Sequence, residues 1–292
     1  MTHSTAAAGK ADFDHIYDRP DPRDYFRTLG QLDYEIPQQA QPVFQSLVTA
    51  LRSGDGGDGD KPLRILDVCC SYGINAALLR CEVSMTELFA RYSNVALDEL
   101  STAELTEADK VYYQQRFRRD DVQVSGLDAA GKAVAYGCQV GLLDSGWTEN
   151  LEADDPSRGL TEHLESIDLI TTTGGVGYIT ERTFDRVVKA RPGRPAPWVA
   201  AFVLRMYSYD RISATLAEHG LVTERLTGVS FPQRQFAGEA EQEATVRQVR
   251  KRGLDTAGLE DAGRYYADFY LSRPTTDAVE PLALLLAGAV QP

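Results

Sequence analysis

The sequence predicts an α/β fold, in which helices cover both faces of a mostly parallel sheet whose C-terminal edge is antiparallel. From Leu63 onward, apolar segments typical of strands alternate with helix-like segments, as in parallel sheets. The last two strand-like segments, residues 221–231 and 265–274, are separated only by a charged insert and are expected to pair as an antiparallel edge. The 292 residues, 43% of them hydrophobic and 25% charged, are enough to bury a large core.

The N-terminal part, residues 1–60, is expected to form a helical cap and linker in front of a ligand-binding domain in residues 61–292. Its first ten residues are small and polar and predict disorder. Its helical periodicity is carried by Phe44, Leu47, Val48 and Leu51. The sequence SGDGGDGD at 53–60 lacks the spacing of a calcium loop and is interpreted as a flexible connector.

The stretch ILDVCCSYGIN, residues 65–75, predicts a buried strand, a tight turn and the start of a helix. Further strands are expected before Asp128, from Asp168 to Thr171, and within residues 197–210. Helix-like segments follow these strands, and Gly220 closes one of them with a C-cap signal. This order of elements indicates a doubly covered parallel sheet.

Residues 81–120 form an unusual block without strand-like alternation, and we expect it to be helical throughout. Ser101 with Glu104 has the pattern of a capping box, and Thr106 with Asp109 repeats it more weakly. Together with the N-terminal helices, this insertion is long enough to form a lid over a ligand. The alternative is a helical decoration remote from the site.

The composition excludes several classes of partner and site. A net charge of −13 repels phosphate backbones and anionic lipid, so neither nucleic acid nor membrane is expected as a partner. None of the four cysteines forms a CxxC pair, so no metal site is expected. No apolar run approaches the ~20 residues of a membrane span. Free thiols and the lack of an export signal predict a cytoplasmic protein.

Polar residues follow the predicted strands, where a parallel sheet collects its ligands. The groups, in chain order, are Asp67 with Cys69 to Asn75, then Asp128, then Asp144, then Thr171 to Tyr178. Their joint placement at successive strand ends predicts a binding site along one edge of the sheet. FPQRQF at 231–236 mixes aromatic side chains with an arginine, and either lines this site or packs on the sheet.

From about Leu63 to Pro274, the chain resembles the class I S-adenosylmethionine (SAM)-dependent methyltransferase superfamily, which has a Rossmann-like seven-stranded sheet with an antiparallel edge. ILDVCCSYGIN is similar to the first motif of that family, an acidic residue followed by a glycine-rich turn. Here Asp67 is the acid, Gly73 is the clear glycine, and Cys69 stands where glycine is common. Because SAM has no phosphate, a turn with few glycines is compatible with it.

The resemblance implies roles for several residues. Asp128 would accept both ribose hydroxyls, and Asp144 would lie near the adenine amine. Thr171 and Gly174, in the fourth motif, would lie beside the methionine part of SAM. Two alternatives stay open, since Asp128 also suits the cap of the following helix and Asp144 the start of a turn.

Aromatic faces attract cations such as the sulfonium of SAM. The candidates are Tyr72, Tyr178, Tyr17 and Tyr25, and the last two also suit a purely structural role as core aromatics. Cys69 is interpreted as a packing residue and not as a nucleophile.

Three functions are compatible with these residues. The first is a methyltransferase acting on a small molecule in biosynthesis, with the acceptor held under the lid. The second consumes SAM alone, as the azetidine-2-carboxylate synthases do, by cyclisation with release of methylthioadenosine; Tyr178, Thr172 and Thr173 would orient the attacking amine. The third is a SAM-binding protein without catalysis. The sequence indicates neither an acceptor nor an oligomeric state.

Overall fold

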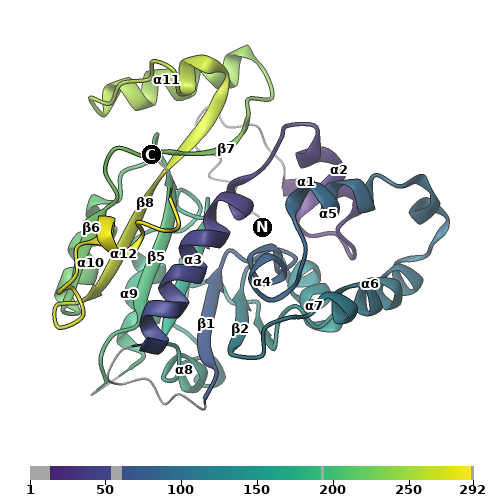
Figure 1. Ribbon diagram of the computed structural model, residues 1–292, viewed down its shortest axis with the longest axis horizontal. Helices are drawn as coiled ribbons and strands as arrows, with labels where there is room; N and C mark the ends of the chain where they lie inside the picture. Colours follow the sequence, from purple (N-terminus) through teal and green to yellow (C-terminus); the bar gives the residue numbers. More distant parts are fainter. Residues whose placement is uncertain (1–13, 54–60, 192–193, 291–292) are drawn as a thin grey trace.

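The computed structural model describes residues 14–53, 61–191 and 194–290, and it contains one eight-stranded sheet (Figure 1). The strand order is β3-β2-β1-β4-β5-β8-β6, with β7 also paired to β8. The strands are β1 (Leu63–Val68), β2 (Val122–Leu127), β3 (Ser145–Trp147), β4 (Leu169–Thr173), β5 (Trp198–Leu204), β6 (Leu221–Arg225), β7 (Phe231–Gln235) and β8 (Arg264–Pro274). Strands β1 to β5 are parallel, and β8 runs antiparallel to β5, β6 and β7. The predicted fold, a mostly parallel sheet with an antiparallel C-terminal edge, is confirmed.

Helices cover both faces of this sheet. They are α1 (Asp14–Tyr17), α2 (Arg23–Gly30), α3 (Ile36–Ser53), α4 (Ile74–Arg80), α5 (Met85–Tyr92), α6 (Thr102–Arg116), α7 (Gly131–Gln139), α8 (Arg158–Leu164), α9 (Glu181–Lys189), α10 (Asp210–Glu218), α11 (Glu239–Lys251) and α12 (Leu282–Leu285), with short 3-10 helices at Val95–Glu99 and Glu260–Ala262. Strand residues alternate between two cores: Ile65 of β1 packs with α3, α4 and α7, whereas Leu66 packs with α8, α9 and α10.

The insertion at 81–120 is mainly helical, as predicted, although its first residues precede α5 as an extended segment. The capping box of Ser101 and Glu104 is present. The weaker signal at Thr106 is not a cap, because Thr106 lies inside α6 and its hydroxyl donates to the carbonyl of Thr102.

The C-terminal edge differs from the prediction in one respect. Residues 221–231 do not form one strand, since they divide into β6 and the start of β7, and these two strands pair with opposite ends of the long β8. The eighth strand, β7, was therefore not predicted.

The N-terminal segment, which we define as residues 16–37, is held between the insertion and β7. Arg23 donates to the carbonyls of Leu97 and Leu100 in the insertion. On the other side, the backbone N–H of Glu35 donates to the carbonyl of Gln233 at 2.7 Å. The predicted disordered start and most of the predicted connector, residues 1–13 and 54–60, lie outside the described residues.

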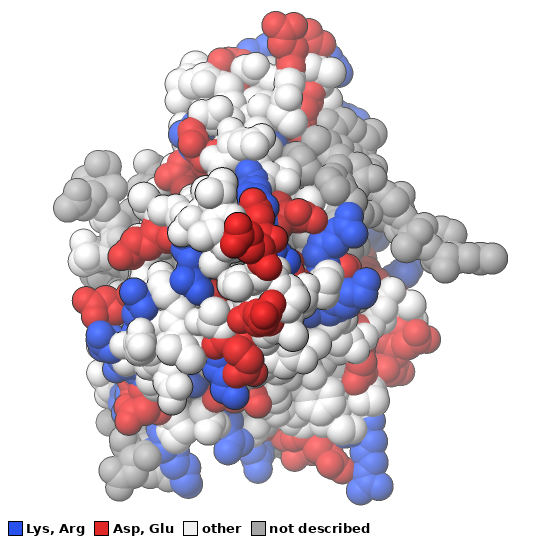
Figure 2. All heavy atoms as spheres, turned by 90° about the vertical axis from the view of Figure 1, so that its right-hand side faces the viewer, with Lys and Arg blue, Asp and Glu red and all other residues white. Residues whose placement is uncertain are grey.

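Charged side chains of both signs are interspersed over the face seen in Figure 2. In Figure 2, no extended basic patch is visible among the described residues of that face. Among the described residues, no helix combines the length and apolar character that crossing a membrane demands.

Candidate functional site

A pocket of about 910 Å³ lies at the carboxyl ends of β1 to β4, where the sheet order predicts a ligand. Along the sheet, its lining comes from the segment after β3, then from β2, β1 and β4, and at the far end from β7. The N-terminal segment covers it through Tyr17, Asp18, Tyr25, Leu29, Tyr34 and Pro37. Its volume is in the range typical of small-molecule sites.

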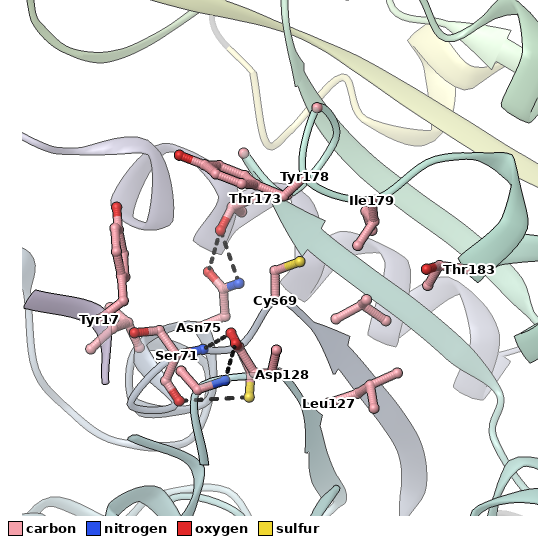
Figure 3. Close-up of a pocket in the computed structure, with 18 of the residues that line it drawn as sticks. Tyr17, Cys69, Ser71, Asn75, Leu127, Asp128, Thr173, Tyr178, Ile179 and Thr183 are labelled. Atoms are coloured by element: carbon pink, nitrogen blue, oxygen red, sulfur yellow. Dashed lines mark hydrogen bonds between the residues drawn. The ribbon is translucent and has the colours of Figure 1, made fainter. Parts of the chain in front are cut away.

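The turn after β1 keeps a left-handed backbone even though it has few glycines. Cys69 and Ser71 have φ angles of +61° and +49°, and Gly73 has a φ of +80° at the start of α4. Non-glycine residues adopt this conformation at a cost, so the surroundings must hold it. Asp128 does so, because its Oδ2 atom accepts the backbone N–H of Ser71 at 2.9 Å (Figure 3).

Asp128 is half-buried and lines the pocket, as predicted for a ligand residue. Its other oxygen, Oδ1, accepts the N–H of Ala130 at 2.9 Å, immediately before α7. Burial raises the pKa of Asp128, and the two backbone donors act against that rise. The contact with Ala130 closes the turn that leads into α7 but does not cap the helix, because the N-cap residue is Ala130 and α7 has no side-chain cap hydrogen bond. The alternative interpretation of Asp128 as a helix cap is therefore wrong.

Asp67 does not line the pocket. It is 1% exposed and accepts hydrogen bonds from Asn75 and from Thr171, whose hydroxyl lies 2.8 Å from Oδ1. Burial raises the pKa of Asp67 to about 7, with the Asn75 and Thr171 hydrogen bonds opposing this rise. Asn75 also donates to Thr173, and these two residues line the pocket in place of Asp67 and Thr171. Asp67 and Thr171 were predicted to contact SAM, but both lie outside the pocket lining. Asp67 instead supports Asn75 from behind, and Thr171 donates to Asp67.

Two other predicted site residues lie outside the lining. Thr172 is fully buried, and its hydroxyl lies behind Gly175, where an added Cβ would be 2.6 Å from Oγ1. Gly73 supports the turn, since a Cβ there would lie 3.3 Å from the side chain of Leu143. Thr173, Gly174, Cys69 and Tyr178 do line the pocket, as predicted.

Tyr72 is likewise not a pocket aromatic. Its fully buried hydroxyl accepts the N–H of Arg19 at 3.0 Å and lies 3.0 Å from the carbonyl of Ile16. The ring packs edge-on against Tyr25 and Tyr136. Tyr72 therefore fastens the N-terminal segment over the pocket, and the prediction that it contacts the sulfonium is corrected.

Replacing Tyr72 with Phe is expected to loosen that segment without unfolding the sheet. The substitution removes hydrogen bonds worth about 0.5–1.5 kcal/mol each while keeping the ring. Hydrogen exchange should become faster at residues 16–19 and stay unchanged in β1 and β4. Tyr266→Phe on β8, outside the lining, is the matched control; equal exchange at residues 16–19 in both variants would contradict the fastening role.

Asp144 lies at the opposite edge of the sheet. It precedes β3, accepts the N–H of Val124 at 2.7 Å and is 3.0 Å from the guanidinium of Arg80. There it lines a separate cavity of about 330 Å³ together with His163. The predicted contact with adenine is therefore wrong, because the residue begins the strand and does not follow it.

The residues that do follow β3 were missed by the sequence analysis. Glu149, Asn150 and Glu152 line the pocket at the end where the resemblance predicts adenine. The strand before them has only three residues, SGW, which is too short to show a periodic signal. Gln233 and Arg234 of β7 were noted only within FPQRQF, and they both belong to a strand and line the pocket.

Tyr17 and Tyr25 both line the pocket, with ring centroids 5.7 Å apart in an edge-to-face arrangement. Tyr178, which follows β4, is 49% exposed and also lines the pocket. Tyr34, which the sequence analysis did not single out, adds a further aromatic wall.

The insertion at 81–120 contributes no residue to the lining. The prediction that it forms a lid is corrected: the N-terminal segment covers the pocket and the insertion supports that segment from outside. The side chain of Asp21, for example, accepts hydrogen bonds from Arg23 and from Thr102 at the start of α6.

The carboxylates in the lining are already engaged. Besides Asp128, Asp18 accepts the N–H of Lys132, Glu149 accepts from Ser157, and Glu152 accepts from Thr180 and Thr183. These hydrogen bonds lower the pKa of Glu152 against the opposing effect of burial. No histidine occurs in the lining among the described residues, and no cluster of three or more potential metal ligands occurs among them either.

The sheet, mostly parallel with an antiparallel edge, has the Rossmann-like architecture that the sequence predicts, and the pocket lies at the carboxyl ends of its parallel strands. Similar solved structures include magnesium protoporphyrin IX methyltransferase from Synechocystis with bound SAM, at 11% identity and a TM-score of 0.40 over 82% of this chain and 81% of that chain. Precorrin-6y C5,15-methyltransferase from Geobacter metallireducens has 10% identity and a TM-score of 0.39 over 80% of this chain and 88% of that chain.

A plantazolicin methyltransferase in complex with S-adenosylhomocysteine has 11% identity and a TM-score of 0.40 over 90% of this chain and 91% of that chain. No protein-family model and no curated protein matches the sequence. The strand order of the chain itself, and not these low scores, therefore defines the fold.

Proposed function

We propose that the protein binds SAM in this pocket and transfers its methyl group to a small molecule. The observation that carries the proposal is the position of Asp128, a carboxylate at the end of β2 that lines the pocket and fastens the turn after β1. Ribose presents two hydroxyl donors, which suit such a carboxylate. Glu149 and Asn150 would then lie at the adenine end, and Asn75 and Thr173 at the methionine end.

The charges of the lining favour a cation. Four carboxylates line the pocket, namely Asp18, Asp128, Glu149 and Glu152, against two guanidinium groups, those of Arg182 and Arg234. Arg234 is paired with Glu241 at 2.7 Å, so its charge is largely compensated. A sulfonium is stabilised in such a field, whereas a phosphate group is not.

When bound, SAM supplies an electrophilic carbon: a nucleophile bonds to that carbon, and the electron pair of the broken carbon–sulfur bond stays on sulfur. The chain would contribute orientation and exclusion of water. Tyr17 and Tyr178 line the pocket, and their rings would stabilise a positive charge by about 0.5–2 kcal/mol each. The N-terminal segment keeps water away from the reacting atoms and limits the size of the acceptor.

Cyclisation of SAM to azetidine-2-carboxylate is a second candidate, and one observation favours it. The described lining has no histidine, and its four carboxylates already accept hydrogen bonds, so few groups are placed to remove a proton from an acceptor. The amine of SAM itself, once desolvated and neutral, needs no separate acceptor site. Tyr178 and Thr173 would orient that amine, whereas Thr172 is buried too deeply to do so.

Incubation of the purified protein with SAM alone tests both candidates. Methyl transfer predicts no turnover until an acceptor is added and S-adenosylhomocysteine afterwards. Cyclisation predicts methylthioadenosine and azetidine-2-carboxylate without any acceptor. Binding of SAM without product under either condition would leave a non-catalytic SAM-binding protein, and the absence of binding would refute the proposed function.

A further inference from the structure

The β7 end of the pocket contains a buried polar side chain without a partner. Gln233 lines the pocket and is 5% exposed, and its Oε1 atom has no hydrogen-bond partner among the described residues. Its amide lies against Gly174, where an added Cβ would be 2.5 Å from Nε2. Because a buried amide oxygen is costly to leave without a donor, this position indicates a missing ligand group.

Hydrogen bonds fix the backbone around Gln233, so the side chain starts from a fixed position at this end of the pocket. Its carbonyl accepts the N–H of Glu35 at 2.7 Å, and the N–H of Gln235 donates to the carbonyl of Leu32 at 2.7 Å. The terminal torsion of the amide is itself soft, because torsions of this kind have broad minima. Gln233 can therefore turn Oε1 toward a ligand without any movement of β7.

Aromatic walls and local charges define what the amide can bind. Tyr25 and Tyr34 lie 6.3 Å apart between ring centroids and are 2% and 9% exposed, so they form a buried aromatic wall. The guanidinium of Arg234 is engaged with both carboxylate oxygens of Glu241, at 2.7 and 3.0 Å, and is not placed as a counter-ion for an anionic ligand. An aliphatic group that carries N–H donors fits these surroundings better than a carboxylate or a phosphate.

We propose that the β7 end of the pocket binds an aliphatic amino group of the substrate, with Oε1 of Gln233 accepting one of its N–H bonds. This inference rests on the proposed function and names the chemistry of one subsite. The amino group has two possible sources: the α-amino group of SAM itself, or a separate amine that receives the methyl group. The same contact serves either source, and the experiment below separates them.

Two substitutions at Gln233 test the proposal. Gln233→Leu removes the acceptor with little change in volume, and Gln233→Glu keeps an acceptor and adds a negative charge. Gln248→Leu in α11, exposed and outside the lining, is the matched control. Thermal unfolding shows first whether each variant is folded.

Calorimetric titration with SAM and with 5′-methylthioadenosine, which lacks the amino acid, forms the first arm. If SAM supplies the amine, Gln233→Leu should weaken SAM binding at least about tenfold and leave methylthioadenosine binding unchanged. The second arm titrates butylamine into protein saturated with S-adenosylhomocysteine. If a separate amine is bound, Gln233→Leu should abolish this binding and leave SAM affinity unchanged.

In either arm, Gln233→Glu should bind the amine at least as tightly as the wild type, and Gln248→Leu should match the wild type. The inference is wrong if Gln233→Leu changes neither arm, if it weakens SAM and methylthioadenosine equally, or if Gln233→Glu is worse than Gln233→Leu. A wild-type protein that binds neither SAM nor methylthioadenosine would instead refute the proposed function.

Discussion

Replacing Asp67 with Asn is expected to remove a large pH dependence from the stability of the protein. Folding raises the pKa of this carboxyl from 3.8 to about 7, because the side chain is buried behind Asn75. The native state therefore binds this proton more tightly than the unfolded state does. The stability of the wild type relative to Asp67→Asn should be greatest below about pH 4, fall as the pH rises to about 7, and stay level above that, with a total change of up to about 4 kcal/mol.

Urea unfolding of both proteins between pH 4 and pH 8.5 measures this difference. The comparison with the variant is necessary, because burial also raises the pKa of other carboxyls, including Asp109 and Glu260. Asp154→Asn, at an exposed position, is the control and should follow the wild-type curve. A difference between wild type and Asp67→Asn that is independent of pH would show that Asp67 is not held in the protonated form.

Replacing Asp128 with Ala is expected to weaken SAM binding by about 1.5–3 kcal/mol, which is roughly 10- to 150-fold. The substitution removes the proposed ribose acceptor and frees the N–H groups of Ser71 and Ala130. The left-handed turn at Cys69 and Ser71 then loses the contact that holds it over the pocket. Isothermal titration with SAM measures the effect.

Asp144→Ala is the matched control for this experiment. Both aspartates were predicted from the sequence to contact SAM, but Asp144 lies at the amino end of β3 and is separated from the pocket by the sheet. SAM affinity should therefore be unchanged in Asp144→Ala. Equal losses in the two variants would mean that the Asp128 effect comes from general destabilisation, and unchanged affinity in Asp128→Ala would leave that residue only its structural hydrogen bonds to Ser71 and Ala130.

Most strands could be predicted from the sequence because the signals that mark them are local. Apolar segments such as 65–68 and 198–204 are buried in the centre of the sheet, and polar residues follow them where the chain turns. The rule that polar residues at the carboxyl ends of parallel strands line a pocket places Asp128 and Thr173 correctly. The rule failed at β3, whose three residues gave no periodic signal, so that Asp144 was assigned to the wrong end of the strand.

The direction of individual side chains could not be predicted from motif similarity. Asp67, Tyr72 and Thr172 lie within or next to the motifs that resemble SAM-binding segments, yet their side chains point into the interior. Successive residues of a strand point their side chains to opposite faces of the sheet. Residues with a left-handed backbone in a turn change the direction of the following side chains again. Motif position therefore identifies a segment but not the atoms that contact a ligand.

The amino-acid sequence by itself determined the sheet, its antiparallel edge and the end at which the pocket lies, because these depend on periodicity and on residues adjacent in the chain. Only the tertiary structure decided what covers that end. Residues 16–37 and β7 are far apart in the sequence, and they meet through backbone hydrogen bonds such as that between Glu35 and Gln233. Such contacts leave no local pattern, because a backbone N–H and carbonyl are present in almost every residue whatever its side chain.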